Sequence, residues 1–369
     1  MSGLTVQVIR QYMAPIKELL DDAQVTDILI YGPDEVHVRR TGKGYERTDI
    51  CWPDADDLLA AVRAIGRIVK RNINADQPIL DSRLPDGSRV NAIISPCFER
   101  GACVSIRLFP KKRFSGDDLV NGGSLDAEGL AILRAIVAAG RNILVSGGTG
   151  SGKTTLLNVL AGMIRSDQVI VTVEDSREIQ IPGENRIWAA LEAKHVVRIE
   201  DTPVGLRELV KNALRMNPTW LIVGEVRGDE AVDLLRAFNT GHCGAGTIHA
   251  NSAFDALLAL ENLVRMGGRD VGALALKEQV ARAIHIVVQV NQFPDESRKV
   301  VEIMEVEGLD YDVSPAHPPY RLRPLYRFMH EGFSREGQVT GNFCVEEHPT
   351  WIEELKMVPD VPMPAAWRD

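Results

Sequence analysis

The chain has 369 residues, enough for two domains, and its 45% hydrophobic and 25% charged residues are usual for a globular protein. A net charge of −9 argues against a dedicated nucleic-acid binder, and five scattered cysteines argue against a disulfide-built fold. No stretch approaches the ~18 consecutive apolar residues of a membrane span, and the first residues lack the apolar core of a signal peptide. We therefore expect a soluble cytoplasmic protein with reduced thiols.

Residues 1–109 are expected to form a small α+β domain. Apolar residues at helical spacing predict helices over 5–22 and 54–73. Short β-branched runs and a Pro-Asp-Gly turn predict strands at 25–32, 35–40, within 80–95 and at 103–109. The charged, glycine-rich residues 110–124 are interpreted as a linker or hinge.

After this linker, apolar strands alternate with helical stretches, which predicts a buried and largely parallel sheet. The expected strands are 142–147, 169–175, 220–226, 245–250 and 285–290. Residues 125–291 are therefore interpreted as an α/β domain. Residues 292–369 are interpreted as a small C-terminal appendage, with one strand near 298–310 followed by turns and a polar tail.

A phosphate-binding loop lies between the first of these strands and a helix. "GGTGSGKT" has the spacing G-x-x-x-x-G-K-T, in which glycines turn backbone N–H groups toward phosphate oxygens. Lys153 would reach the outer phosphates, and the Thr154 hydroxyl would ligate Mg²⁺. The sequence thus predicts bound ATP and Mg²⁺, with contacts from Gly147, Gly148, Thr149, Gly150, Ser151, Gly152, Lys153, Thr154 and Thr155.

Carboxylates follow two of the predicted strands. Glu225 ends an apolar strand, where it could hold the magnesium shell or orient the attacking water. Glu174, Asp175 and Glu178 follow another strand, and their mutual repulsion calls for a cation or a water network. A solvated acidic loop is the alternative interpretation of these three residues.

Two histidines lie in the glycine-rich stretch 239–252. A zinc site is rejected because His242, Cys243 and His249 lack ligand spacing. Sensing of the terminal phosphate by an imidazole is the better interpretation, and buried hydrogen-bonded histidines are the alternative. Charge on a transferred phosphoryl group also needs arginines, and the candidates are Arg83, Arg89, Arg107, Arg215 and Arg227.

Taken together, these segments resemble a known family over roughly residues 20–350. The family is the hexameric ATPases of the type II and type IV secretion superfamily. Its Walker A loop is resembled by "GGTGSGKTT", and its Asp box by "VEDSREIQ". Its Walker B and His boxes are resembled by the run 214–251. "DSRLPDGSRVNAIISP" and "SIRLF" resemble its tight-adherence (Tad) pilus assembly branch and the conjugation-type relatives. The tail "YRLRPLYRFMHEGF…GQVTGNF" resembles that of the Tad branch, which favours this branch over the conjugation-type relatives. The early start of the chain and the text after the Asp box depart from the Tad pattern.

The resemblance implies a RecA-like ATPase domain that hydrolyses ATP with Mg²⁺. It implies a homo-hexamer at the cytoplasmic face of the inner membrane, acting on a platform protein of a pilus or secretion machine, without stable nucleic-acid binding. By position it gives Glu225 the role of Walker B acid and leaves the water-activating base open between Glu178 and Glu225. It makes Glu174 a second Asp-box acid, His249 and His242 phosphate sensors, and Arg89 and Arg107 nucleotide contacts. A DNA translocase or helicase ring and a nucleotide-gated scaffold remain the alternatives.

Overall fold

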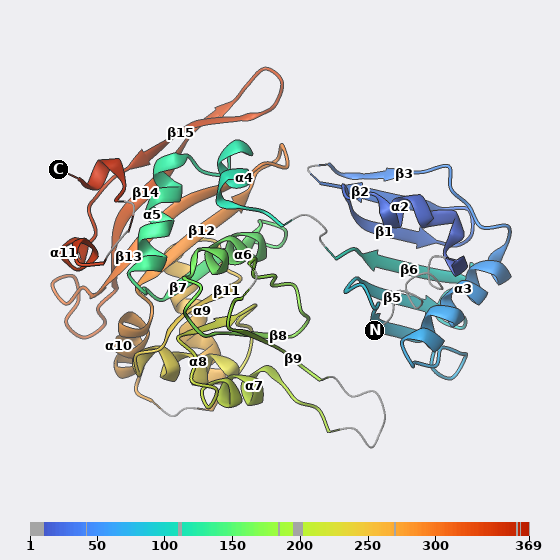
Figure 1. The fold of residues 1–369 in the computed structure, drawn as a ribbon, viewed down its shortest axis with the longest axis horizontal. Coiled ribbons are helices and arrows are strands. Elements are labelled where there is room, and N and C mark those ends of the chain that lie inside the picture. Colours follow the sequence, from blue (N-terminus) through green and yellow to red (C-terminus); the bar gives the residue numbers. More distant parts are fainter. Residues whose placement is uncertain are drawn as a thin grey trace. The chain divides into compact units, whose positions relative to one another are not determined.

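The chain divides into two units, Met1–Arg113 and Phe114–Asp369 (Figure 1). Each unit has a hydrophobic core of its own. The computed structural model describes residues 11–41, 43–109, 113–183, 185–194, 202–268, 271–358, 361 and 363–368.

The first unit contains an antiparallel sheet with the strand order β3-β2-β1-β6-β5-β4. Its strands are β1 (Val25–Tyr31), β2 (Val36–Arg40), β3 (Tyr45–Arg47), β4 (Ile79–Arg83), β5 (Arg89–Ile94) and β6 (Ala102–Arg107). Its helical elements are η1 (Ala14–Ile16), α2 (Lys17–Asp21) and α3 (Ala55–Ile68). This α+β arrangement is the one expected. The predicted helix over 5–22 is confirmed at residues 11–12 and 14–21, with a turn at Met13, and residues 1–10 lie outside the described part.

Alternation along the strands separates the two faces of this sheet. Val90 and Val104 are buried in the core, and so are their like-facing neighbours on the same strands. Asn91 and Ser105, which oppose one another on β5 and β6, point to the other face. Because side chains alternate with period two, one face of the sheet is apolar and the opposite face is polar.

The second unit is built on a larger mixed sheet. Within the described ranges its order is β15-β14-β13-β12-β7-β11-β10-β8-β9, parallel from β12 to β9 and antiparallel from β12 to β15. The strands are β7 (Ile143–Gly147), β8 (Ile170–Glu174), β9 (Trp188–Glu192), β10 (Trp220–Val223), β11 (Cys243–Ile248), β12 (Ile286–Gln292), β13 (Arg298–Leu309), β14 (Tyr320–Phe333) and β15 (Val339–Val345).

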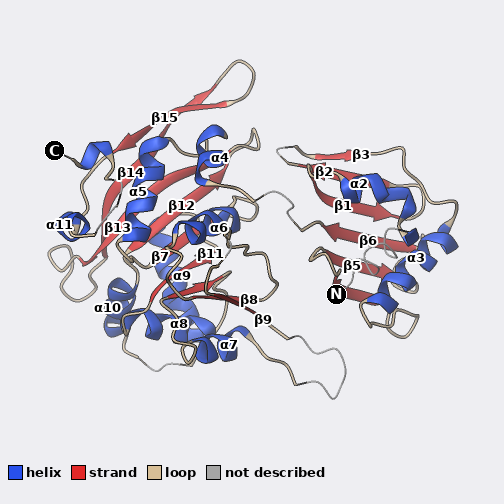
Figure 2. Cartoon of the chain, in the orientation of Figure 1, coloured by secondary structure: helices blue, strands red, loops and turns tan. Residues whose placement is uncertain are grey.

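Helices cover both faces of this sheet (Figure 2). One apolar cluster joins the sheet to α4, α5, α6 and α11, and a second joins it to α7, α8, α9 and α10. The helical elements are α4 (Gly116–Asn121), α5 (Ala127–Ala138), α6 (Lys153–Met163), α7 (Leu206–Ala213), α8 (Glu230–Asn239), α9 (Ala253–Met266), α10 (Ala273–Ala283), α11 (Ile352–Lys356) and η2 (Ala365–Trp367). Two such layers on a mostly parallel sheet confirm the predicted fold class.

The structure differs from the expected elements in residues 292–369. The interpretation of one strand followed by turns and a polar tail is wrong, because β14 and β15 extend the sheet beyond β13. Their apolar residues, such as Tyr326, pack onto α5, which lies far away in the sequence. No local sequence pattern therefore predicts these two strands. Strand β9 was also not anticipated, since Trp188–Glu192 has no clear alternation.

Part of the predicted linker is regular structure. Helix α4 lies inside 110–124 and begins with a capping box between Ser115 and Asp118, while residues 110–112 lie outside the described part. Leu119 of α4 belongs to the core of the second unit. Among the described residues, no helix combines the length and apolarity needed to cross a membrane.

Candidate functional site

The predicted site residues of the second unit gather where its parallel strands end. Strands β7, β8, β10, β11 and β12 are parallel neighbours, so the loops after them leave the same edge of the sheet. Ligands of open α/β sheets bind at this carboxyl edge. The phosphate loop follows β7, and the Glu225 and His249 loops follow β10 and β11.

The phosphate loop has the backbone that its sequence predicts. Gly150 and Gly152 adopt positive φ values of 75° and 98°, which glycine reaches without strain. Helix α6 begins at Lys153 directly after Gly152, so its unpaired N–H groups and positive dipole end face the loop. Thr154 and Thr155 lie half-buried in its first turn. The loop and helix therefore form an anion cradle.

Lys153 lies inside this cradle. Its ammonium donates to the carbonyl oxygens of Gly147 at 2.9 Å and Gly148 at 2.7 Å. Burial lowers the pKa of Lys153, and the nearby Glu225 carboxylate opposes that shift. The cation is thus held at the position from which it would meet phosphate.

His249 connects this lysine to Glu225. Lys153 Nζ lies 3.2 Å from His249 Nδ1, and His249 Nε2 lies 3.0 Å from Glu225 Oε1. Because an ammonium has only donors, Nδ1 accepts, and the ring proton on Nε2 is donated to the carboxylate. The structure therefore brings together Lys153, His249 and Glu225, which lie up to 96 positions apart in the chain.

The acids after β8 have different environments. Glu174 is buried, and its Oε1 accepts backbone N–H bonds from Glu178 at 2.8 Å and Ile179 at 2.9 Å. Its carboxylate thus holds the Asp-box loop in place. Glu178 is half-buried, and Asp175 pairs with exposed Arg227 at 2.7 Å. This last pair ties the loop after β8 to the loop after β10.

His242 and His249 lie at opposite ends of β11. His242 precedes the strand and its Nδ1 lies 3.2 Å from the carbonyl oxygen of Ala237, whereas His249 follows the strand. Seven residues of extended chain span roughly 20 Å. Within one chain the structure thus does not bring His242 to the phosphate loop.

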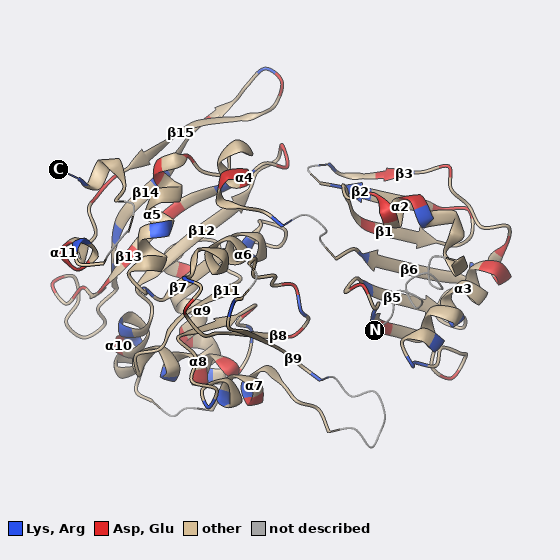
Figure 3. Ribbon diagram, in the orientation of Figure 1, with Lys and Arg blue, Asp and Glu red and all other residues tan. Residues whose placement is uncertain are grey.

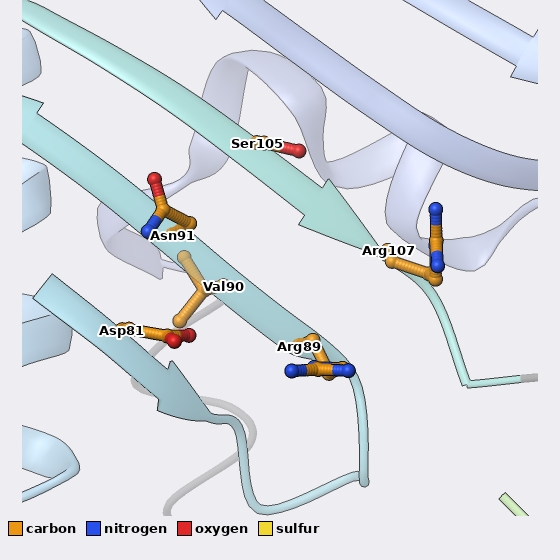
Figure 4. Close-up of a pocket in the computed structure, with 6 residues that line it drawn as sticks. All are labelled: Asp81, Arg89, Val90, Asn91, Ser105 and Arg107. Carbon is orange, nitrogen blue, oxygen red and sulfur yellow. The ribbon is translucent and has the colours of Figure 1, made fainter. Parts of the chain in front are cut away.

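The first-unit arginines Arg89 and Arg107 oppose each other across β5 and β6 on the polar face of their sheet. Figure 4 shows them with Asp81, Asn91 and Ser105. These residues line a hollow with a volume of about 250 Å³. Arg107 Nε also donates to Asp27 Oδ1 at 3.2 Å. Arg83 belongs to the same row, because it is the register partner of Arg89 on β4, and its Nε donates to the carbonyl oxygen of Gly87. Arg215 lies in the second unit, where it is exposed after α7.

Sequence reasoning missed the residues of the β12–β13 hairpin that border the loop. Arg298 Nε donates to the carbonyl oxygen of Gly150 at 2.8 Å, across 148 positions of sequence. It also missed Glu230, whose buried carboxylate accepts from Arg227 N and Gly228 N and shapes the loop beside Glu225. The signal in the sequence for the role of Glu230 is the pair of acids at the start of α8, because acidic side chains are favoured near helix N-termini. The sequence around Arg298 contains no local pattern that predicts its contact with the phosphate loop.

Comparison with known proteins finds relatives that are named for conjugal transfer or type IV secretion. A putative conjugal transfer protein of Mycobacterium tuberculosis (strain H37Rv) is 34% identical over 295 residues, covering 78% of this chain and 82% of that protein. The conjugal transfer protein TrbB of Rhizobium radiobacter is 30% identical, covering 78% and 86%. The type IV secretion system protein PtlH of Bordetella pertussis is 33% identical, covering 74% and 91%.

Solved structures share the fold. The ATPase DotB of Legionella pneumophila has a TM-score of 0.59 at 20% identity, covering 80% of each chain. The pilus retraction motor PilT, solved with bound ADP, has a TM-score of 0.56 at 18% identity, covering 95% of this chain and 87% of that one. The second unit is RecA-like, as expected. The model of the type II/IV secretion system protein family matches residues 10–307, and the chain belongs to that family.

Proposed function

We propose that this chain is an ATPase that powers a secretion or pilus assembly machine of the conjugation type. The contact chain from Lys153 through His249 to Glu225 at the phosphate loop carries the proposal. It places a cation, a proton donor and a carboxylate beside an anion cradle. Phosphoryl transfer to water needs such groups at once, for charge neutralisation and for orienting the nucleophile.

The residues present fit a nucleotide with Mg²⁺. The positive-φ glycines and the first turn of α6 suit phosphate, and Lys153 supplies its cation. The Thr154 hydroxyl and the Glu225 carboxylate are oxygen donors of the kind that Mg²⁺ takes, directly or through water. When bound, the ion would neutralise charge on the phosphates.

Each polar residue of this site would then have a separate role in hydrolysis. Glu225, 36% exposed and hydrogen-bonded to His249, would orient the attacking water, with Glu178 as the second candidate base. His249 would donate to the terminal phosphate through its Nε2–H, which in this structure is directed at Glu225. Arg227, and Arg89 and Arg107 from the first unit, would neutralise charge on the nucleotide.

The relatives support the assembly part of the proposal. TrbB and the mycobacterial protein are named for conjugal transfer, and PtlH is named for type IV secretion. We propose a homo-hexamer at the cytoplasmic face of the inner membrane, docked on a platform protein, with a hinge between the units in the part of the predicted linker that precedes helix α4. Work would come from motion at that hinge during the ATP cycle.

A DNA motor is the competing function, and charge speaks against it. The net charge is −9, and Figure 3 shows both signs of charge on helices α7 and α8. There Arg207 pairs with Asp229 and Asp233, each at 2.9 Å. Basic side chains neutralised in this way do not form the electrostatic footprint of a nucleic-acid binder.

The test is the rate of ATP hydrolysis per subunit against protein concentration, with and without DNA. We expect a rate that rises as subunits assemble, ignores DNA, and falls about 100-fold or more in Glu225→Gln while nucleotide binding persists. Stimulation by DNA would favour a translocase instead. Turnover equal to that of Lys153→Ala would favour a nucleotide-gated scaffold.

A further inference from the structure

The β12–β13 hairpin forms one wall of the phosphate loop. A Cβ placed on Gly150 would lie 3.1 Å from Gln292 Oε1, and one on Gly152 would lie 3.2 Å from Arg298 Cδ. Arg298 Nε donates to the Gly150 carbonyl oxygen at 2.8 Å. The hairpin thus contacts the loop at both of its positive-φ glycines.

The bond to the Gly150 carbonyl controls the direction of the next N–H. In a trans peptide, the carbonyl of Gly150 and the N–H of Ser151 point in opposite directions. The carbonyl points to Arg298, and the Ser151 N–H points across the loop to the Gly148 carbonyl oxygen at 3.4 Å. That carbonyl also accepts from Lys153 Nζ, so the N–H faces the interior of the cradle.

Among the described residues, the Arg298 bond acts on this peptide from one side and the longer Ser151 N–H contact with Gly148, at 3.4 Å, from the other; Gly150 itself adds no side chain that could fix it. Gly150 is exposed, and a glycine can adopt many backbone conformations at small cost. A cation on the outer side of the peptide restricts it to the orientation in which the N–H is available to phosphate. Such preorganisation raises affinity by reducing the ordering cost of binding.

We propose that Arg298 is a positioning residue, which holds the Gly150–Ser151 peptide with its N–H toward the phosphates of the bound nucleotide. This inference rests on the proposed nucleotide binding. The adjacent Lys299 provides a matched control, because its Nζ donates to the Gly123 carbonyl oxygen at 2.6 Å and not to the loop.

The experiment measures the Kd for ADP by fluorescence titration in the full chain, for wild type, Arg298→Met, Arg298→Lys and Lys299→Met. Loss of one charge-assisted hydrogen bond is expected to weaken binding about tenfold in Arg298→Met. Lys299→Met should stay within about twofold of wild type, and Arg298→Lys should recover much of the loss because it keeps a cationic donor.

Melting without nucleotide separates positioning from folding. Without nucleotide, Arg298→Met should have a melting temperature close to that of the wild type. Added ADP should raise this temperature less in the variant, because a ligand that binds more weakly stabilises the folded state less. Should that variant unfold, Arg298→Gln, which keeps neutral N–H donors, takes its place, with an intermediate Kd expected. Equal Kd values for wild type and Arg298→Met, or an equal loss in Lys299→Met, would overturn the inference alone. A wild type that does not bind ADP would overturn the proposed function as well.

Discussion

One added methyl group should distinguish two adjacent glycines of the phosphate loop. An alanine Cβ at Gly147 would lie 2.2 Å from the carbonyl oxygen of Val290 and 2.5 Å from Ser151 Oγ, whereas one at Gly148 meets nothing within 4 Å. Neither glycine has a positive φ, so backbone conformation does not separate them. The comparison therefore isolates the steric contact with β12.

The expected difference in the free energy of unfolding between the two variants follows from that contact. Gly147 is paired with Val290 in the parallel β7–β12 ladder, so relief requires movement of backbone in the sheet. Overpacking of this kind costs about 1–3 kcal/mol. Both alanines also restrict the unfolded chain, which stabilises each variant by about 0.4–1 kcal/mol. We expect Gly147→Ala to be less stable than Gly148→Ala by about 2 kcal/mol.

Urea unfolding measures this difference, followed by tryptophan fluorescence, since four of the five tryptophans lie in the second unit and Trp220 among them is 2% exposed. Gly148→Ala should unfold at or slightly above the urea concentration of the wild type, and Gly147→Ala clearly below it. Coincident unfolding curves for the two variants would refute the reasoning that the β12 backbone excludes a side chain at Gly147.

Two further substitutions test other parts of the second unit. Glu174→Ala removes the acceptor of two backbone N–H groups and should lower the free energy of unfolding in urea by about 2–3 kcal/mol. Glu174→Gln keeps an oxygen acceptor and should stay closer to the wild type. Equal losses of stability in the two variants would argue against the role of Glu174 as acceptor for these N–H groups. Burial lowers the pKa of His285 from 6.5 to about 4, so the unfolded chain binds the proton first as pH falls, and stability should drop between pH 6.5 and 4. This loss is about 2 kcal/mol from pH 7 to pH 5 and should shrink in His285→Gln, which keeps an acceptor for Asn142 N; an unchanged pH profile of thermal unfolding would contradict it.

The elements that the sequence predicted correctly are those with a strong local pattern. The apolar β-branched runs of β7, β8, β10, β11 and β12 and the phosphate loop are readable because their period and spacing lie within a few residues. Strands β14 and β15 were missed because their apolar residues find partners on α5 and β13, far away in the chain. For such strands, pairing and burial decide the conformation, and propensity is a weak guide.

The same division holds for the site. By itself the sequence determined that a phosphate loop exists and which carboxylates and histidines accompany it, because residue types and short spacings carry that chemistry. Only the tertiary structure decided that His249 joins Lys153 to Glu225 while His242 lies at the far end of the same strand. It alone placed Arg298 on the Gly150 carbonyl, since strand order and hairpin position set contacts between residues 148 positions apart, and no local pattern encodes that order.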